Sequence, residues 1–173
     1  KLIFAKDNID VIDNTKITYK YLQKIKSVNL DHGMLDLKFK DISSLKYCQN
    51  IETIQLGKFM ENIDFSIFSQ LKKVKKFTYR ALIIKLKNFD FIKNWEHLQE
   101  LIINGDFPSE IEMNALSLTP NLQKLEITIT SNCDLTPILS LKNLKSLVIN
   151  SNKNIDVSIL KLHENIKTCL RNS

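Results

Sequence analysis

Apolar residues return along this chain in six similar rows, which are separated by more polar stretches. Within a row the residues stand three apart at first and two apart at the end. Successive rows start 23, 24, 24, 22 and 22 residues apart, and so regular a period is typical of repeat proteins. The rows are Ile42, Leu45, Cys48, Ile51, Ile54, Leu56; Phe65, Phe68, Leu71, Val74, Phe77, Tyr79; Phe89, Ile92, Trp95, Leu98, Leu101, Ile103; Met113, Leu116, Thr119, Leu122, Leu125, Ile127; Leu135, Ile138, Leu141, Leu144, Leu147, Ile149; and Val157, Leu160, His163, Ile166, Cys169, Arg171.

Each row changes its spacing partway along, which predicts two kinds of secondary structure within one repeat. A spacing of three places residues on one face of a helical turn, whereas a spacing of two places them on one face of a strand. An Asp directly before a row can accept hydrogen bonds from the unpaired N–H groups of the first turn. Such an Asp, followed two residues later by Ser or Thr, stands at Asp41, Asp64, Asp134 and Asp156.

A single repeat of this size cannot bury its apolar face, so we expect the repeats to stack. Each strand then pairs in parallel with the next. The predicted fold is an α/β solenoid with a curved parallel sheet on its concave face and short helices on its convex face. We expect one domain over residues 1–173, with a capping region and a first irregular repeat in 1–40, about six repeats in 41–171, and a tail at 172–173.

The two ends of the predicted array depart from the pattern. A first strand is expected at about residues 27–31, after a helical stretch through residues 17–25. Alternation over residues 35–39 predicts a short additional strand, and residues 9–12 are expected to form an edge strand in the front cap. At the back, Arg171 stands where the row calls for an apolar residue, so we expect it to mark either the capped end or a cut within a longer array.

The fifth row and the residues after it carry a known motif. Residues 144–160, LKSLVINSNKNIDVSIL, resemble the L-x-x-L-x-L-x-x-N-x-I-x-D-I-S-x-L pattern of leucine-rich repeats. The short period resembles that of bacterial internalins, and the resemblance covers roughly residues 41–171. In that family an Asn ties the turn after the strand to its neighbour, and Asn152 matches it here. Less regular loops are expected at the turns that carry Phe59, Leu82, Asp106 and Thr130 instead.

Residues with catalytic or metal-binding chemistry are few and scattered. His32, His97 and His163 lie in different repeats, and no second His or Cys stands at metal-binding spacing from His163. The sequence contains no glycine-rich phosphate loop, no nucleophile elbow and no H-E-x-x-H motif. The sequence therefore predicts a protein that is not an enzyme and that uses no cofactor or metal.

The number and positions of the three cysteines indicate the redox state of the cellular compartment. Cys48 and Cys169 occupy apolar positions of the rows and are expected to be small core residues. Cys133 is the expected exposed thiol, without a nearby His or Lys to lower its pKa. An odd number of cysteines at this low density favours a reducing compartment, so we expect a cytoplasmic protein. No apolar stretch of the sequence is long enough to span a bilayer, so no membrane insertion is expected.

Strand residues that face away from the core line the concave face, which is where solenoids commonly bind macromolecules. On this face Ile102 and Val148 are expected to be exposed, which marks either a protein contact or simply β-propensity. We expect a non-enzymatic module that binds a protein partner there, or more narrowly an inhibitor of the immunity-protein type. The predicted partner-binding residues are Gln55, Lys76, Thr78, Arg80, Glu100, Ile102, Asn104, Lys124, Glu126, Thr128, Val148 and Asn150.

Positive charge is concentrated in residues 58–93, which hold nine Lys or Arg against three acidic residues and account for the net charge of +6. This basic segment predicts a solvated surface, a site for an acidic protein, or a nucleic-acid site. Nucleic acid is the least favoured of these, because the aromatic residues of the second and third rows occupy core positions and cannot stack on bases. A different possibility is an array segment of a larger surface protein or adhesin. As an isolated chain we expect a monomer.

Overall fold

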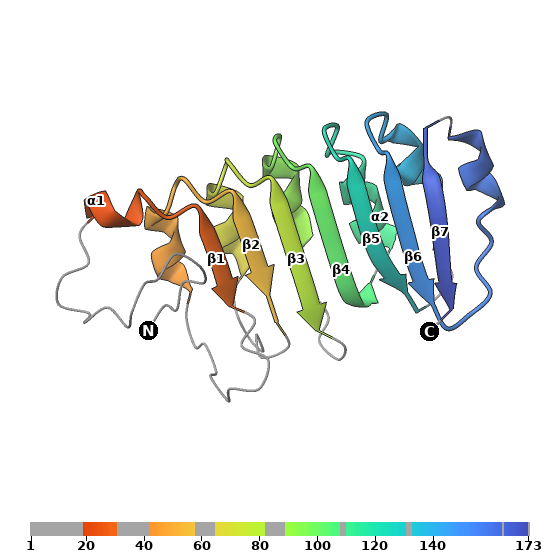
Figure 1. The fold of residues 1–173 in the computed structure, drawn as a ribbon, viewed down its shortest axis with the longest axis horizontal. Helices are drawn as coiled ribbons and strands as arrows, with labels where there is room; N and C mark the ends of the chain where they lie inside the picture. Colours follow the sequence, from red (N-terminus) through yellow and green to blue (C-terminus); the bar gives the residue numbers. More distant parts are fainter. Residues whose placement is uncertain are drawn as a thin grey trace.

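The structure is a computed structural model that describes residues 19–30, 42–57, 65–81, 89–107, 110–130, 133–163 and 165–172. Seven parallel strands form one sheet in the order of the sequence, so that every strand pairs with the strands of the repeats before and after it. The sheet is the near layer in Figure 1, and the short helical segments lie behind it. The strands are β1 (Ser27–Leu30), β2 (Thr53–Leu56), β3 (Lys76–Ala81), β4 (Glu100–Phe107), β5 (Lys124–Ile129), β6 (Ser146–Ser151) and β7 (Lys167–Asn172).

The segments on the far side of the sheet are mostly 3-10 helices, where the sequence pattern predicted helical turns. A 3-10 helix has about three residues per turn, so it places a row with spacing three on one face. The seven-residue α2 is the one convex segment between these strands, in the described chain, that forms an α-helix. The helices are α1 (Tyr19–Leu22), η2 (Ser43–Tyr47), η3 (Phe65–Gln70), η4 (Phe89–Asn94), α2 (Glu110–Leu116), η5 (Thr136–Ser140) and η6 (Ser158–Leu162).

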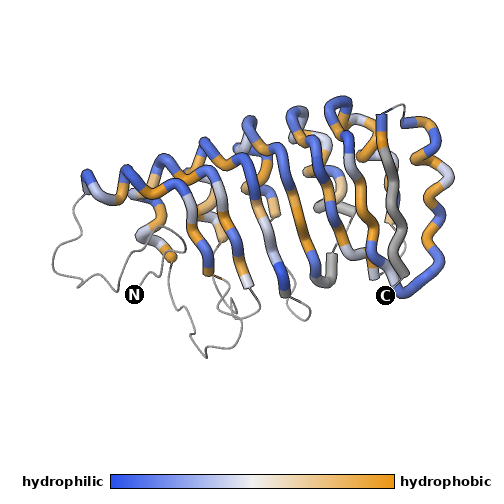
Figure 2. The backbone as a smooth tube through the Cα atoms, in the orientation of Figure 1, coloured by the Kyte–Doolittle hydropathy of each residue, from blue (hydrophilic) through white to orange (hydrophobic). Residues whose placement is uncertain are grey.

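A single continuous core lies between the sheet and the helical segments. All six residues of each of the first five rows are buried, as predicted. Apolar residues recur at matching places along successive turns of the chain in Figure 2. The sixth row is less enclosed, because Leu160 is buried whereas Val157 and Ile166 are only partly buried. The expected solenoid with stacked repeats is therefore confirmed.

Aromatic rings fill the core of the second and third repeats. Phe68 lies 5.5 Å from Phe91 and 6.1 Å from Phe77 between ring centroids, and both pairs are edge-on. Trp95 lies 5.0 Å from Phe91 and donates a hydrogen bond from Nε1 to the carbonyl of Phe68 over 3.0 Å. The buried indole N–H is therefore satisfied by the preceding repeat, which ties the two helical segments together.

Side-chain amides connect successive turns at the amino ends of the strands. The Nδ2 groups of Asn50, Asn121 and Asn143 donate to carbonyls of the preceding repeat over 2.7–2.8 Å. We call these three residues the amide ladder. At the opposite ends of the strands, Asn152 is exposed, and the bond between repeats comes from Ser151, whose Oγ donates to the carbonyl of Ile129 over 2.9 Å. The role expected for Asn152 from the family pattern is thus taken by its neighbour.

The last strand corrects the sixth row. Thr168 and Leu170 pair with the core residues Leu147 and Ile149, whereas Cys169 pairs with Val148 and Arg171 with Asn150. Cys169 and Arg171 therefore hold register positions of the outward-facing rows rather than those of the core rows. Every earlier repeat separates its fourth and sixth row members by five residues, but Ile166 and Leu170 are four apart.

The expected start signals and front elements are confirmed where the structure describes them. The Oδ1 atoms of Asp134 and Asp156 accept hydrogen bonds over 2.8 Å from the backbone N–H groups of Thr136 and Ser158, the first residues of η5 and η6. Asp41 and Asp64 lie outside the described residues. β1 falls at the predicted first strand, and α1 lies within the predicted helical stretch. The strands expected at residues 9–12 and 35–39 also lie outside the described part.

Candidate functional site

The face of the sheet that lies away from the helices carries the residues predicted to bind a partner, and we call it the concave face. Strand residues alternate between the core and this face, and the parallel register aligns them in three rows across the sheet. All of the predicted partner-binding residues lie on β2 to β6. The first row holds Lys76, Glu100 and Lys124, and the middle row holds Gln55, Thr78, Ile102, Glu126 and Val148. The third row pairs Arg80 with Asn104 and Thr128 with Asn150, and the register shifts between these two pairs.

The middle row corrects the prediction of an exposed apolar patch. Ile102 is 6% exposed and Val148 is 8% exposed, and neither belongs to the main core cluster. Ile102 stands between Thr78 and Glu126 in register, and neighbouring strands are only about 4.8 Å apart, so side chains on the adjacent strands cover it. The two residues close the floor of the concave face, and polar groups make most of its accessible surface.

Two polar contacts cross the centre of the concave face. Lys76 Nζ lies 2.8 Å from Glu100 Oε2, and both side chains are well exposed, so this ion pair contributes at most about 1 kcal/mol. Asn104 Nδ2 lies 3.4 Å from Glu126 Oε1. The reversed amide would set two oxygens against each other, so the observed orientation of Asn104 is favoured. Its Oδ1 is buried without a hydrogen-bond partner.

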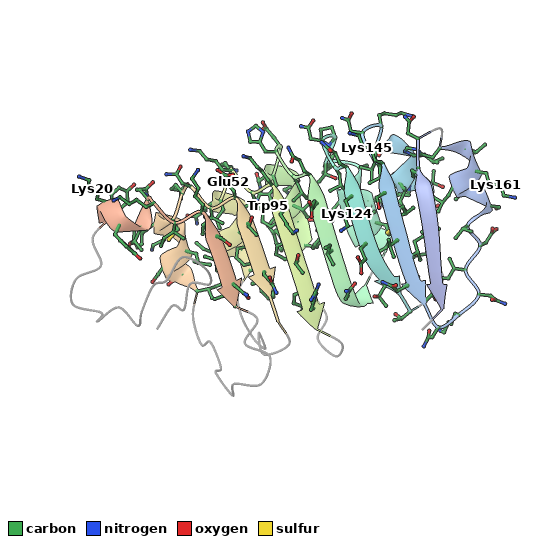
Figure 3. All side chains as sticks on the ribbon, in the orientation of Figure 1. Lys20, Glu52, Trp95, Lys124, Lys145 and Lys161 are labelled. Atoms are coloured by element: carbon green, nitrogen blue, oxygen red, sulfur yellow. The ribbon has the colours of Figure 1, made fainter. Side chains whose placement is uncertain are left out.

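Arg80 and Lys124 differ from Lys76 in that no side chain of the described residues forms an ion pair or hydrogen bond with them. Arg80 is exposed near the carboxyl end of β3, and Lys124 is partly exposed at the start of β5. Figure 3 shows Lys124 at the sheet, in contrast to Lys161, which projects from η6 at the end of the molecule.

The described lysines of the basic segment contact other side chains, most of them in neighbouring repeats. Lys75 Nζ lies 2.8 Å from Glu52, and this contact lowers the pKa of the Glu52 carboxyl. Lys72 and Lys73 donate to the side-chain oxygens of Asn94 and Asn50 over 3.1 and 2.6 Å. Lys93 lies 3.8 Å from Asp90. The described cations of this segment therefore serve mainly to connect side chains within the fold, and Arg80 is the exception.

The groups with possible nucleophilic or ligand chemistry are structural. Burial raises the pKa of the Cys48 thiol to about 11, and burial together with Asp134 raises that of Cys133, which is half-buried rather than exposed. His163 Nε2 lies 3.0 Å from the carbonyl of Leu141, and its Nδ1 accepts from the N–H of Asn165 over 3.3 Å. His97 is exposed, and His32 lies outside the described residues.

Within the part of the chain that the structure describes, no three His, Cys, Asp or Glu residues gather to hold a metal ion. The same part contains no helix long and apolar enough to cross a bilayer.

The structure adds two register positions to the concave face that the sequence pattern had placed in the core. Cys169 extends the middle row beside Val148, and Arg171 extends the third row beside Asn150. The signal that could have found them is the shortened interval between Ile166 and Leu170, which shifts the register of β7 by one residue.

Solved structures resemble this fold over most of the chain. No protein-family model and no curated protein matches the sequence. Internalin C2 from Listeria monocytogenes superposes with a TM-score of 0.60 and 18% identity, covering 91% of this chain and 77% of that one. A leucine-rich repeat protein of Leptospira interrogans gives 0.59 and 17%, covering 87% and 38%. Another Listeria monocytogenes internalin gives 0.58 and 21%, covering 88% and 49%.

These likenesses agree with the repeat pattern and with the register of the sheet. The chain spans less than half the length of two of the three structures named, so what those whole proteins do does not transfer to it directly. At identities of 17–21% these likenesses show the fold. The chain is a leucine-rich repeat protein in its fold, with the internalin-like arrangement of short repeats that its sequence predicted.

Proposed function

We propose that this protein is a non-enzymatic recognition module that binds a protein partner on its concave face. The observation that carries the proposal is the aligned surface of outward-facing side chains on β2 to β6, presented by a sheet whose other face is filled by the core. Such a surface is rigid, and its residues can change without disturbing the core. An inhibitor of the immunity-protein type is the narrower form of the same proposal.

Nucleic acid is a less well supported partner. Most described lysines of the basic segment already contact Glu52, Asn50, Asn94, Asp90 or Glu100, so fewer are available for phosphates. The buried aromatic rings offer no stacking platform for bases.

A capture experiment with matched variants tests the proposal. The purified protein is immobilised, incubated with a lysate of its source cells, and the retained proteins are identified by mass spectrometry. We expect Arg80→Glu to abolish capture of the specific partner, because it reverses the charge of an exposed cation on the concave face. Lys161→Glu on η6 is the control, since it also reverses one charge but lies away from the sheet.

The two variants should keep the melting temperature of the parent protein, which separates loss of binding from loss of folding. Capture that survives Arg80→Glu but disappears with Lys161→Glu would contradict the proposal and move the binding surface to the helical side.

A further inference from the structure

The centre of the concave face contains a compact group of eight residues around Ile102. The register sets Lys76, Glu100 and Lys124 side by side, then Thr78, Ile102 and Glu126, and it sets Arg80 beside Asn104. We call these eight residues the Ile102 patch. Ile102 and Thr78 are almost fully buried, at 6% and 5% exposure, so the charged and amide side chains stand around a closed floor.

The charges of the Ile102 patch are only partly neutralised within it. Lys76 and Glu100 form an ion pair at 2.8 Å, and Glu126 contacts the amide of Asn104 at 3.4 Å. Arg80 and Lys124 remain without an ion-pair or hydrogen-bond partner among the described side chains. Two cations are therefore available to groups that come from outside.

These two cations lie at opposite corners of the patch. Arg80 is on β3 in the third row, and Lys124 is on β5 in the first row, so they are two strands and four residues apart. With strands about 4.8 Å apart and a rise of about 3.3 Å per residue, their Cα atoms are separated by about 16 Å along a diagonal that passes over Ile102. In an extended chain, residues i and i+4 face the same side and lie about 13 Å apart. Long Arg and Lys side chains can cover the remaining distance.

We propose that the Ile102 patch binds an extended acidic segment of the protein partner, in which two carboxylates four residues apart contact Arg80 and Lys124. This inference rests on the proposed function and specifies the chemistry of the partner. Arg80 can bind a carboxylate with two parallel N–H···O bonds, whereas Lys124 acts as a point charge. Ile102 and Thr78 are almost fully buried and offer little apolar surface between the two cations, which favours recognition through charges at the two ends.

Synthetic peptides test this spacing directly. The probe is a fluorescein-labelled twelve-residue peptide of Gly, Ser and Thr with two Glu residues at i and i+4. The comparison peptides carry the two Glu residues at i and i+2, or Gln in place of both. Fluorescence anisotropy at moderate salt should show the i, i+4 peptide binding about two- to fivefold more tightly than the i, i+2 peptide, the range that one exposed ion pair supplies.

Single substitutions then locate the site. Arg80→Ala and Lys124→Ala should each weaken binding of the i, i+4 peptide about two- to fivefold and remove its advantage over the i, i+2 peptide. Arg80→Lys should retain part of the affinity, because it keeps the charge but loses the paired hydrogen bonds. Lys161→Ala is the matched control, since it removes one exposed cation from η6, and it should leave binding unchanged.

Several outcomes would overturn the proposal. Equal weakening by Lys161→Ala would mean that only net charge matters, and equal binding of the Gln peptide would mean that carboxylates are not recognised. Tighter binding of mixed-sequence DNA, lost with Arg80→Ala, would assign the patch to nucleic acid. The absence of amide chemical-shift changes on β3 to β5 at millimolar peptide would also exclude binding of the acidic segment to the Ile102 patch. If the peptides fail while Arg80→Glu still abolishes partner capture, the proposed function stands and only the acidic segment is wrong.

Discussion

The aromatic region, residues 65–107, and the aliphatic region, residues 133–172, build similar repeats from different side chains. Trp95 and Leu141 hold the same place in the third and fifth rows, and each is at most 1% exposed. Around Trp95 the core consists of edge-on and tilted rings, whereas around Leu141 it consists of Leu and Ile. The parallel register of the sheet is nevertheless continuous from β3 to β7, apart from a shift between Ile103 and Phe107 on β4.

In both regions a ring nitrogen on the helical side contacts a backbone carbonyl of the preceding repeat. In the aromatic region, the indole of Trp95 donates to a carbonyl of the preceding repeat, at Phe68. In the aliphatic region, the imidazole of His163 is 3.0 Å from a carbonyl of the preceding repeat, at Leu141. Both rings occupy the third position of their row, so a ring nitrogen there links neighbouring repeats. The repeat backbone therefore requires a core of sufficient apolar volume and a few hydrogen bonds between repeats, but it does not require that the core be aromatic or aliphatic.

The largest effect on stability is expected from removing the buried ring of Trp95 from the aromatic region. Trp95→Ala should lower the free energy of unfolding by about 3–5 kcal/mol, because it removes a fully buried ring, leaves a cavity and deprives the Phe68 carbonyl of its donor. Leu141→Ala at the matching position should cost about 2–5 kcal/mol, toward the lower end because a smaller side chain is removed. Urea denaturation monitored by circular dichroism measures both. A smaller loss for Trp95→Ala than for Leu141→Ala would contradict the view that the rings hold the front repeats together.

An intermediate effect is expected at the link provided by His163. His163→Phe keeps a ring of similar size but removes both nitrogens, so it should cost about 1 kcal/mol through the lost contacts with Leu141 and Asn165. The loss should be local, with faster hydrogen exchange of β6 and β7 amides and unchanged exchange in β3 and β4. Asn143→Ala, which removes one bond of the amide ladder, is the comparison variant in the same region. Uniformly faster exchange through the whole sheet would show that His163 supports the global fold instead.

The sequence predicted the fold because burial in a stacked repeat imposes a strict spacing. Every member of the first five rows is buried, and the repeated period set the order of the strands correctly. The pattern failed where one residue is missing. The interval from Ile166 to Leu170 is short, so the last two positions of the sixth row, Cys169 and Arg171, are in register with the outward-facing rows instead of the core rows. A shift of one residue reverses the face of every side chain in a strand.

The candidate site was only partly predictable. The alternation of strand residues placed Glu126 and Arg80 on the outward-facing rows, but it could not show that Ile102 would be covered by its neighbours, since exposure depends on side chains of adjacent strands. Composition also overstated the number of cations in the basic segment that are available to bind a partner. Counting residues could not reveal that Lys75 lies against Glu52 from another repeat, 23 positions away, while Arg80 has no such partner among the described side chains.

The smallest effect is expected from the Asp residues that begin the aliphatic repeats. Hydrogen bonds from Thr136 lower the pKa of Asp134, and hydrogen bonds from Ser158 lower that of Asp156, while both carboxylates remain exposed. Because the pKa is lower in the folded state, each carboxylate stabilises the fold above its unfolded pKa, near 4, and this contribution is lost as the pH falls through the folded value. The double variant Asp134→Ala, Asp156→Ala should therefore melt slightly below the parent at pH 7, with the difference shrinking at about pH 3.

Replacing both residues with Asn separates the charge from the hydrogen bond. The Asn side chain keeps an oxygen that can accept from the Thr136 and Ser158 N–H groups, so this variant should melt close to the parent at pH 7. It lacks a titrating group, so its melting temperature should fall less than that of the parent between pH 5 and pH 3. If the Ala and Asn variants respond to pH exactly as the parent does, these two carboxylates do not contribute to acid unfolding. The ion pair of Glu52 with Lys75 would then be the next contact to test.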